Sequence, residues 1–323
     1  MTRRIEKMIR WYNSIPEEIK LVFLFVFALL ILTSIIFYIL DKTIHNHLTS
    51  DLIKRNNSWW KIAIGVFIIG TFPRIYGTII VAFISFSTLR EMLSISPLRA
   101  SDRLAIFLCY LAVPIQFHLA YVGFYNGFII FITLIMFIII PIILMLSGST
   151  KGIGRSMSII PSILLVTVYM PSHLMMLFHL EFKDFLLGGT GLLLYVIILA
   201  SFNDIFQYIW GKLLGNKKKM LPKIVPDRTY GGFLLGLIST AGLAILIRFL
   251  TPFTFWQAIL LGTVIGICGF FGDALLQAIK RDLKIRDTGS VLPGHGGFLD
   301  RLDSLIIAIP IYYHIIRYIA NLS

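Results

Sequence analysis

The sequence predicts an all-α fold, that of a polytopic integral membrane protein with about nine transmembrane helices. Three observations support this prediction. The chain is 57% hydrophobic and 14% charged, and its mean hydropathy is +0.86. Apolar stretches long enough to cross a bilayer recur along it, and Lys and Arg gather in some of the polar connections between them. With so few charged residues, 323 residues have too little polar surface to cover a soluble globule.

Nine stretches approach the length of about 20 predominantly apolar residues that a helical span requires. They lie roughly at 20–40, 59–88, 104–122, 125–147, 158–178, 184–201, 231–250, 255–279 and 302–320. The second stretch is overlong, and Pro73 and Arg74 interrupt it. Because proline removes a backbone donor and clashes with the preceding turn, this stretch is either one kinked helix or two short ones.

The distribution of basic residues favours the single kinked span, because Lys and Arg concentrate in short cytoplasmic loops. With one kinked span, the polar segments fall into two sets on opposite faces. The presumed inner set holds 20 Lys and Arg and the outer loops hold 4. The inner segments are 1–19, 89–103, 148–157, 202–230 and 280–301, and the outer loops are 41–58 and 179–183.

The chain shows no repeat of fixed period and no linker rich in Pro or Ser, which favours one membrane domain. Within it we distinguish a basic N-terminus at 1–19, expected in the cytoplasm, N-terminal membrane helices at 20–201, and a C-terminal membrane region at 202–323. The long polar loops of this last region are expected to meet on the cytoplasmic face. Cys109 and Cys268 fall within predicted spans, so neither a disulfide framework nor a cysteine metal motif is expected.

Residues 271–303 hold the densest polar sequence in the chain, with five aspartates, five basic residues and one histidine between apolar helices. Carboxylates suit a hard cation such as Mg²⁺, and Lys and Arg suit phosphate oxygens. The turn around Gly296 and Gly297 would let the backbone approach a ligand closely. This combination predicts a polyphosphate site at one membrane face.

Helix ends can bring the carboxylates of this stretch together. Asp273 closes the eighth span and Asp300 opens the last, so both could hold one cation. Alternatively, Asp300 caps the helix that is expected to begin near Leu302. Asp303 lies on the same helical face as Asp300, which makes it a candidate for supporting the metal ligands or for binding an outer cation, and Asp287 is the other candidate for this role.

The end of the chain also carries a recognisable motif. It reads Lys280-Arg281, Arg286-Asp287-x-Gly289 and Leu292-Pro293-x-His295-Gly296-Gly297-Phe298-x-Asp300-Arg301-Leu302-Asp303. This pattern resembles the signature of the phosphatidate cytidylyltransferase family, the CDP-diacylglycerol synthases. The family has Ser at Gln277 and Lys at Arg286.

A second block, upstream, resembles the same family at the offsets of Asp204, Tyr208, Gly211, Lys212 and Gly215. The family then has Ser-Pro-x-Lys-Thr-x-Glu-Gly where this chain has Val225-Pro-Asp-Arg-Thr-Tyr-Gly-Gly232. The resemblance covers roughly residues 200–305, and the first 200 residues agree only in having several spans.

The resemblance implies that a phosphate oxygen of phosphatidate attacks the α-phosphorus of CTP, so that CDP-diacylglycerol forms for phospholipid biosynthesis and pyrophosphate leaves. Such chemistry depends on positioning and charge neutralisation, which metal ions and Lys or Arg supply. Mg²⁺ is the expected cofactor, and a second cation stays open. The expected metal ligands are Asp273 and Asp300.

The other expected roles divide into catalysis and substrate binding. The catalytic candidates are Asp287, His295, Arg301 and Asp303. His295 would donate a proton to the leaving pyrophosphate or, alternatively, only brace its turn. The substrate-binding candidates are Lys280, Arg281, Arg286, Gly296, Gly297, Asp204 and Arg228.

The sequence leaves three alternatives to this function: a transporter, a lipid kinase that uses CTP, and the same reaction on another lipid phosphate. A carrier would place ionisable residues near the middle of several spans, whereas here they gather at one face. The expected partners are CTP and a phosphatidate-type lipid, with no nucleic acid, and a homodimer stays open. The expected location is the inner (cytoplasmic) membrane of a bacterial cell, with the site at the cytoplasmic face.

Overall fold

The structure is a computed structural model, and it describes residues 2–44, 47–215, 218–289 and 296–321. The described chain is helical apart from one short antiparallel hairpin, β1 (Lys219–Leu221) and β2 (Val225–Thr229). The first four helices are α1 (Thr2–Ser14), α2 (Glu17–Ile44), α3 (His47–Thr71) and α4 (Arg74–Ile95). The next are α5 (Arg103–Val122), α6 (Tyr125–Ile130), α7 (Phe137–Leu146), α8 (Ile153–Leu164) and α9 (Met170–Met176). The last are α10 (Gly188–Leu213), α11 (Tyr230–Leu246), α12 (Phe255–Asp282) and α13 (Leu299–Ala320).

The prediction of a polytopic, all-helical membrane protein is confirmed. Eight helical segments of the described chain are long and apolar enough to cross a membrane. They correspond to α2, α4, α5, α6–α7, α8–α9, α10, α12 and α13, in which single π-helical turns join α6 to α7 and α8 to α9. The predicted span at 231–250 forms α11, an apolar helix of 17 residues.

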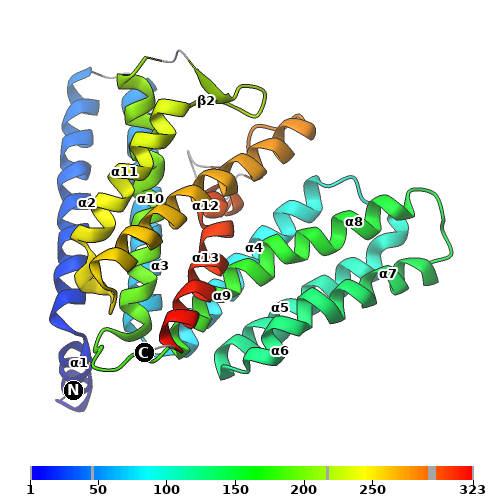
Figure 1. Cartoon of the computed structure of the whole chain (residues 1–323), viewed down its shortest axis with the longest axis horizontal. Helices are drawn as coiled ribbons and strands as arrows, with labels where there is room; N and C mark the ends of the chain where they lie inside the picture. The colour runs from blue at the N-terminus through cyan, green and yellow to red at the C-terminus, as the bar shows by residue number, and fades with distance from the viewer. Residues whose placement is uncertain (1, 45–46, 216–217, 290–295, 322–323) are drawn as a thin grey trace.

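The prediction of one kinked span at 59–88 is wrong. Helix α3 ends at Thr71, α4 begins at Arg74, and the chain turns back between them (Figure 1). A Cβ atom placed on Gly77 would lie 3.2 Å from the carbonyl oxygen of Ile69, a contact that two successive halves of one helix could not make. Pro73 therefore marks a reversal rather than a kink, because it lacks the amide that would continue α3.

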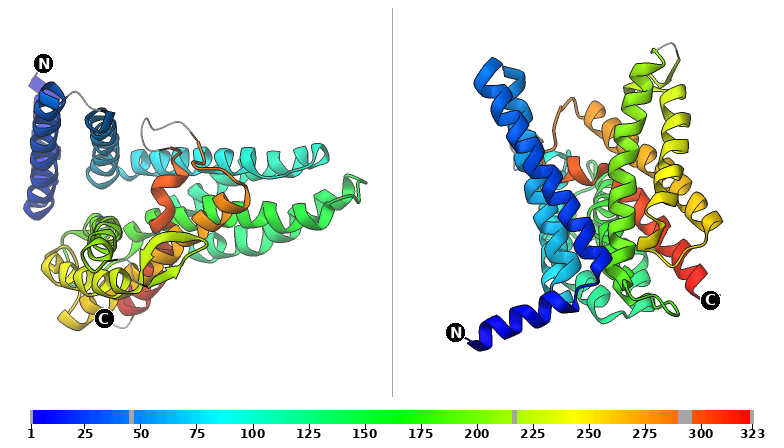
Figure 2. Two further views of the ribbon diagram at one scale, coloured as in Figure 1. Left: turned by 90° about the horizontal axis from the view of Figure 1, so that it is seen from above. Right: turned by 90° about the vertical axis from the view of Figure 1, so that its left-hand side faces the viewer.

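The reversal also places the N-terminus on the face opposite to the one that the sequence predicts. The indole nitrogen of Trp11 donates to the carbonyl oxygen of Thr71 at 2.8 Å, so α1 lies beside the α3–α4 turn. The ends of α4, α7, α10 and α12, from which polar connections continue, lie along the opposite margin of the molecule (Figures 1 and 2). The expectation that residues 1–19 share a face with these connections is therefore wrong.

Glycines set the packing of the C-terminal helices. Gly262, Gly266, Gly269 and Gly272 follow one another along α12 and let other helices approach its backbone. A Cβ atom on Gly266 would lie 3.0 Å from Asn203 Oδ1 of α10, and one on Gly269 would lie 3.7 Å from the Cβ of Ser304 of α13. These contacts bring α10, α12 and α13 together at the level of their polar residues.

A candidate active site in a cavity between the helices

A cavity of about 630 Å³ lies between α3, α4, α9, α10 and α13. Its two parts differ in chemistry. Apolar side chains of α3, α4 and α9 form one part, among them Ile62, Val66, Val81, Ile84 and Leu174. Charged and polar residues of α10, β2, α12 and α13 form the other part: Asp204, Arg228, Asp273, Asp300, Arg301, Asp303 and Ser304. Lys61 lies on the α3 wall. The cavity thus offers an apolar wall and an ionic end to one ligand.

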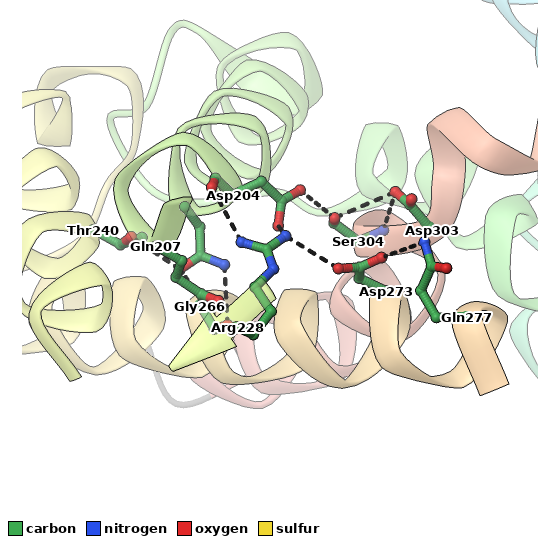
Figure 3. Close-up of polar contacts among 10 residues, drawn as sticks. Asp204, Gln207, Arg228, Thr240, Gly266, Asp273, Gln277, Asp303 and Ser304 are labelled. Carbon is green, nitrogen blue, oxygen red and sulfur yellow. Dashed lines mark hydrogen bonds and ion pairs between the residues drawn. The ribbon is translucent and has the colours of Figure 1, made fainter. Parts of the chain in front are cut away.

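Three carboxylates from three helices converge at the ionic end (Figure 3). Asp204 comes from α10, Asp273 from α12 and Asp303 from α13. They lie close enough for their negative charges to repel one another. The hydroxyl of Ser304 donates to Asp204 and, at 3.3 Å, to Asp303. This convergence joins the two sequence blocks into one site.

Arg228 of β2 is the cation at the centre of this cluster. Its Nη2 atom lies 3.2 Å from Asp204 Oδ1 and 3.0 Å from Asp273 Oδ2, and its Nη1 donates to the Asp204 carbonyl oxygen at 3.2 Å (Figure 3). A planar guanidinium can bridge two carboxylates in this way, whereas the lysine of the family pattern would make a point contact. Gln277, which replaces the family's serine, donates to Asp273 at 3.4 Å.

A buried amide network holds these helices in register. Asn203 donates to the carbonyl oxygen of Gly266 at 3.2 Å, and its Oδ1 accepts from Gln207 at 3.1 Å and from Thr240 at 3.2 Å. The three side chains are almost completely buried. Because Asn203 precedes Asp204 and its contacts reach α11 and α12, this network fixes the position of the Asp204 backbone relative to Asp273.

Asp300 accepts hydrogen bonds from other groups of the protein on both of its carboxylate oxygens. Its Oδ1 accepts from Lys280 Nζ at 2.9 Å, and its Oδ2 accepts from Gly297 N at 2.9 Å and from the amide and hydroxyl of Thr288, both at 3.0 Å. Both carboxylate oxygens are thus occupied. Helix α13 already begins at Leu299, so Asp300 does not cap it but reaches back to the preceding loop.

Glu91 of α4 is a site residue that the sequence analysis missed. The residue is 8% exposed, and its carboxylate accepts from the amides of Phe298 and Leu299 at 3.0 and 3.1 Å and from the Thr288 hydroxyl at 3.4 Å. These amides belong to the first turn of α13, where a negative charge is favourable. Glu91 therefore connects α4, in the N-terminal half of the chain, to the described residues of the loop between α12 and α13, which carries the signature motif.

Gly296 and Gly297 are needed for these anchors. Gly296 has a φ of +78°, which favours glycine, and a Cβ atom there would collide with Asp300. A Cβ atom on Gly297 would collide with Glu91. The sequence predicts that a ligand approaches the backbone at these glycines; in the structure, two carboxylates of the protein lie against them.

Other expected site residues lie apart from the cavity. Arg281, Arg286 and Asp287 are exposed, and the described lining includes none of them. Arg281 instead donates to the carbonyl oxygen of Ile224 in the β-hairpin connection. His295 falls outside the described residues.

The anchoring role of Glu91 predicts a loss of stability in Glu91→Ala. The amides of Phe298 and Leu299 would lose their acceptor in a buried place, which costs about 1–3 kcal/mol. We expect the purified variant to unfold at a lower temperature in detergent, measured by tryptophan fluorescence. Glu18→Ala, which removes an exposed carboxylate from α2, is the matched control. Equal unfolding temperatures for Glu91→Ala and the wild type would contradict the anchoring role.

Comparison with known proteins matches most of the chain to one protein family. The model of the cytidylyltransferase family matches residues 53–319. The chain is 35% identical over 293 residues to the uncharacterized protein YnbB of Escherichia coli K12, a match that covers 90% of this chain and 96% of that protein.

Two phosphatidate cytidylyltransferases match over a shorter length. The chain is 36% identical to that of Staphylococcus haemolyticus over 125 residues, which cover 38% of this chain and 48% of that protein. It is 32% identical to that of Bacillus subtilis over 145 residues, which cover 44% and 54%. The chain thus matches about half the length of these two relatives. Since the family model spans most of the chain and the YnbB match nearly all of it, the protein belongs to the cytidylyltransferase family.

Proposed function

We propose that the protein transfers a cytidylyl group from CTP to the phosphate of a phosphatidate-type lipid, producing a CDP-activated lipid and pyrophosphate. The observation that carries this proposal is the cavity, whose apolar wall and ionic end match the two parts of a lipid phosphate. Membership of the cytidylyltransferase family supports CTP as the donor.

The reaction requires no nucleophile from the protein. A phosphate oxygen of the lipid forms a bond to the α-phosphorus of CTP, and the bond between that phosphorus and the bridging oxygen of the β-phosphate breaks. The released pyrophosphate carries the negative charge away. The protein must therefore hold the lipid phosphate and the triphosphate of CTP close together. Arg228 and Arg301 are the cations of the ionic end that could neutralise their charge. Lys280, in contrast, is engaged by Asp300.

The carboxylate cluster supports a role for Mg²⁺, although no three His, Cys, Asp or Glu side chains of the described residues could hold a metal ion by themselves. Mg²⁺ is usually bound by one or two carboxylates together with substrate phosphates. Asp273, with Asp303 beside it, fits that pattern. Asp300 fits less well, because its Oδ2 already accepts three hydrogen bonds and its Oδ1 pairs with the buried Lys280, whereas each oxygen of Asp273 has one partner. When bound, Mg²⁺ would neutralise charge on the phosphates of CTP.

We propose further that the site faces the cytoplasm of a bacterial cell from the inner membrane. Most Lys and Arg residues lie in the connections at the site's end of the molecule, which the positive-inside rule favours as the cytoplasmic end. CTP is available on that side. Under this orientation α1 lies at the opposite face.

A second candidate is the same reaction on a lipid phosphate other than phosphatidate. The lengths of the matches support this second candidate. YnbB matches nearly the whole chain, whereas the two phosphatidate cytidylyltransferases match less than half of it.

A panel of acceptors tests both candidates. The purified protein in detergent receives CTP and Mg²⁺ with phosphatidate, lysophosphatidate or a polyprenyl phosphate, and pyrophosphate is measured. We expect release that requires a lipid phosphate and is fastest with phosphatidate. A faster rate with another acceptor would favour the second candidate. Binding of CTP without release in the presence of any acceptor would overturn the proposal.

A further inference from the structure

Lys61 is a charged residue in an otherwise apolar part of α3. It follows Trp59 and Trp60 and precedes the run Ile-Ala-Ile-Gly-Val-Phe-Ile-Ile. Its side chain lines the cavity. Lys61 is exposed, and it is the one cation that the described part of α3 contributes to this lining. The family match begins at residue 53, but the signature residues quoted above all lie beyond residue 200, so none of them assigns a role to this lysine.

The charges around the cavity leave Lys61 available for a ligand. Arg228 is shared by Asp204 and Asp273, and Arg301 lies beside Asp300 and Asp303 in the sequence. Lys61 lies on α3, and none of the described side chains of this helix contributes a carboxylate to the cavity lining. Among the described residues, no hydrogen bond or ion pair engages it. A phosphate placed near the three carboxylates would therefore have Lys61, on the α3 wall of the cavity, as a cation that no carboxylate of the cluster engages.

The same face of α3 continues as an apolar surface. Ile62, Gly65, Val66 and Ile69 follow Lys61 at helical spacing, and all four line the cavity. A Cβ atom on Gly65 would have no other atom within 4 Å, so the space beside it is open. Glycine in the middle of a helix is unfavourable, and packing does not require it here. An elongated apolar group can occupy this space.

We propose that Lys61 binds the phosphate of the acceptor lipid and that α3 from Ile62 to Ile69 seats an acyl chain. This inference rests on the proposed function, since it assigns the acceptor's position in the same cavity. The inference makes α3, rather than the loop that carries the signature motif, the element that recognises the acceptor lipid.

The first test separates the lipid from the nucleotide. In Lys61→Gln, we expect the KM for dioctanoyl phosphatidate to rise roughly 10- to 100-fold, the effect of losing a hydrogen bond between charged groups. The KM for CTP and the kcat at saturating lipid should stay within about threefold of the wild type. Lys61→Arg should restore most of the lipid affinity. Lys183→Gln, an exposed lysine between α9 and α10, is the matched control. An unchanged lipid KM in Lys61→Gln overturns the inference.

The second test fills the space beside Gly65. We expect Gly65→Leu to slow turnover of dioleoyl phosphatidate at least about tenfold more than that of the dioctanoyl lipid, because a shorter chain leaves room for the new side chain. Gly242→Leu is the control, since Gly242 also has open space around it but lies on the exposed surface of α11. Equal effects on both lipids contradict the assigned seat.

Binding measured without turnover keeps this inference separate from the proposed function. Native mass spectrometry reports dioctanoyl phosphatidate bound to the wild type, Lys61→Gln and Lys183→Gln. Weaker binding by Lys61→Gln alone supports the inference, even if the wild type turns no phosphatidate over and the proposed function fails. Equal binding by all three proteins, or no binding by the wild type, overturns it.

Discussion

Asp300→Ala is expected to destabilise the protein by about 3–5 kcal/mol, because it leaves the Lys280 charge buried without its partner. The two side chains are only 9% and 7% exposed for Lys280 and Asp300, and their ion pair measures 2.9 Å. The substitution also removes the acceptor of the Gly297 and Thr288 amides. Thermal unfolding in detergent should show a lower transition temperature.

A double variant tests the cause. Lys280→Met removes the stranded charge, so Asp300→Ala combined with Lys280→Met should be more stable than Asp300→Ala alone. Asp303→Asn is a contrasting variant, because it relieves repulsion among the three carboxylates and should not lower stability. The account fails here if Asp300→Ala unfolds at the temperature of the wild type, or if Lys280→Met makes the single variant worse.

Asp273→Asn is expected to lower the rate of pyrophosphate release by on the order of 100-fold or more, the usual effect of removing a group that controls charge at a reacting centre. Asparagine keeps the size of the side chain, and it removes the negative charge that faces Arg228 and the proposed Mg²⁺. The measurement is lipid-dependent pyrophosphate release at saturating CTP.

The matched control is Asp282→Asn, which changes an exposed aspartate at the end of the same helix. It should retain the rate of the wild type. Unfolding temperatures of both variants should stay near that of the wild type, so that a lost rate reports on chemistry. Turnover by Asp273→Asn within a few-fold of the wild type would show that the cluster does not carry the reaction.

The local motifs predicted much of the ionic end. Two separate sequence blocks supply five residues that the structure brings to one cavity: Asp204, Arg228, Asp273, Arg301 and Asp303. This prediction was possible because helix ends and short polar connections constrain where such side chains lie.

The role of Asp300 could not be separated in advance from that of Asp273. Both are aspartates at helix ends, and both fit a metal site by residue type alone. Their difference lies in the donors that surround them, and those donors include the Thr288 hydroxyl and backbone amides. Backbone amides are present in every sequence, so no residue pattern reports them.

The contributions of the N-terminal half were missed for another reason. Glu91 is the only acidic residue of α4, and Lys61 interrupts an apolar run, so a signal for each was present. Hydropathy could not tell whether Pro73 marks a kink or a reversal, because either leaves the same apolar residues on both sides. Only the reversal brings α3 back along the molecule, where it forms a wall of the cavity.

The most direct test of the central claim follows the two ends of the triphosphate. The purified protein receives phosphatidate, Mg²⁺ and CTP labelled at either the α- or the γ-phosphate, and the lipid fraction is counted. A cytidylyltransferase transfers the α-label to the lipid and releases the γ-label as pyrophosphate, which is the result we predict. Transfer of the γ-label to the lipid, with CDP as the other product, would contradict the account and identify a lipid kinase.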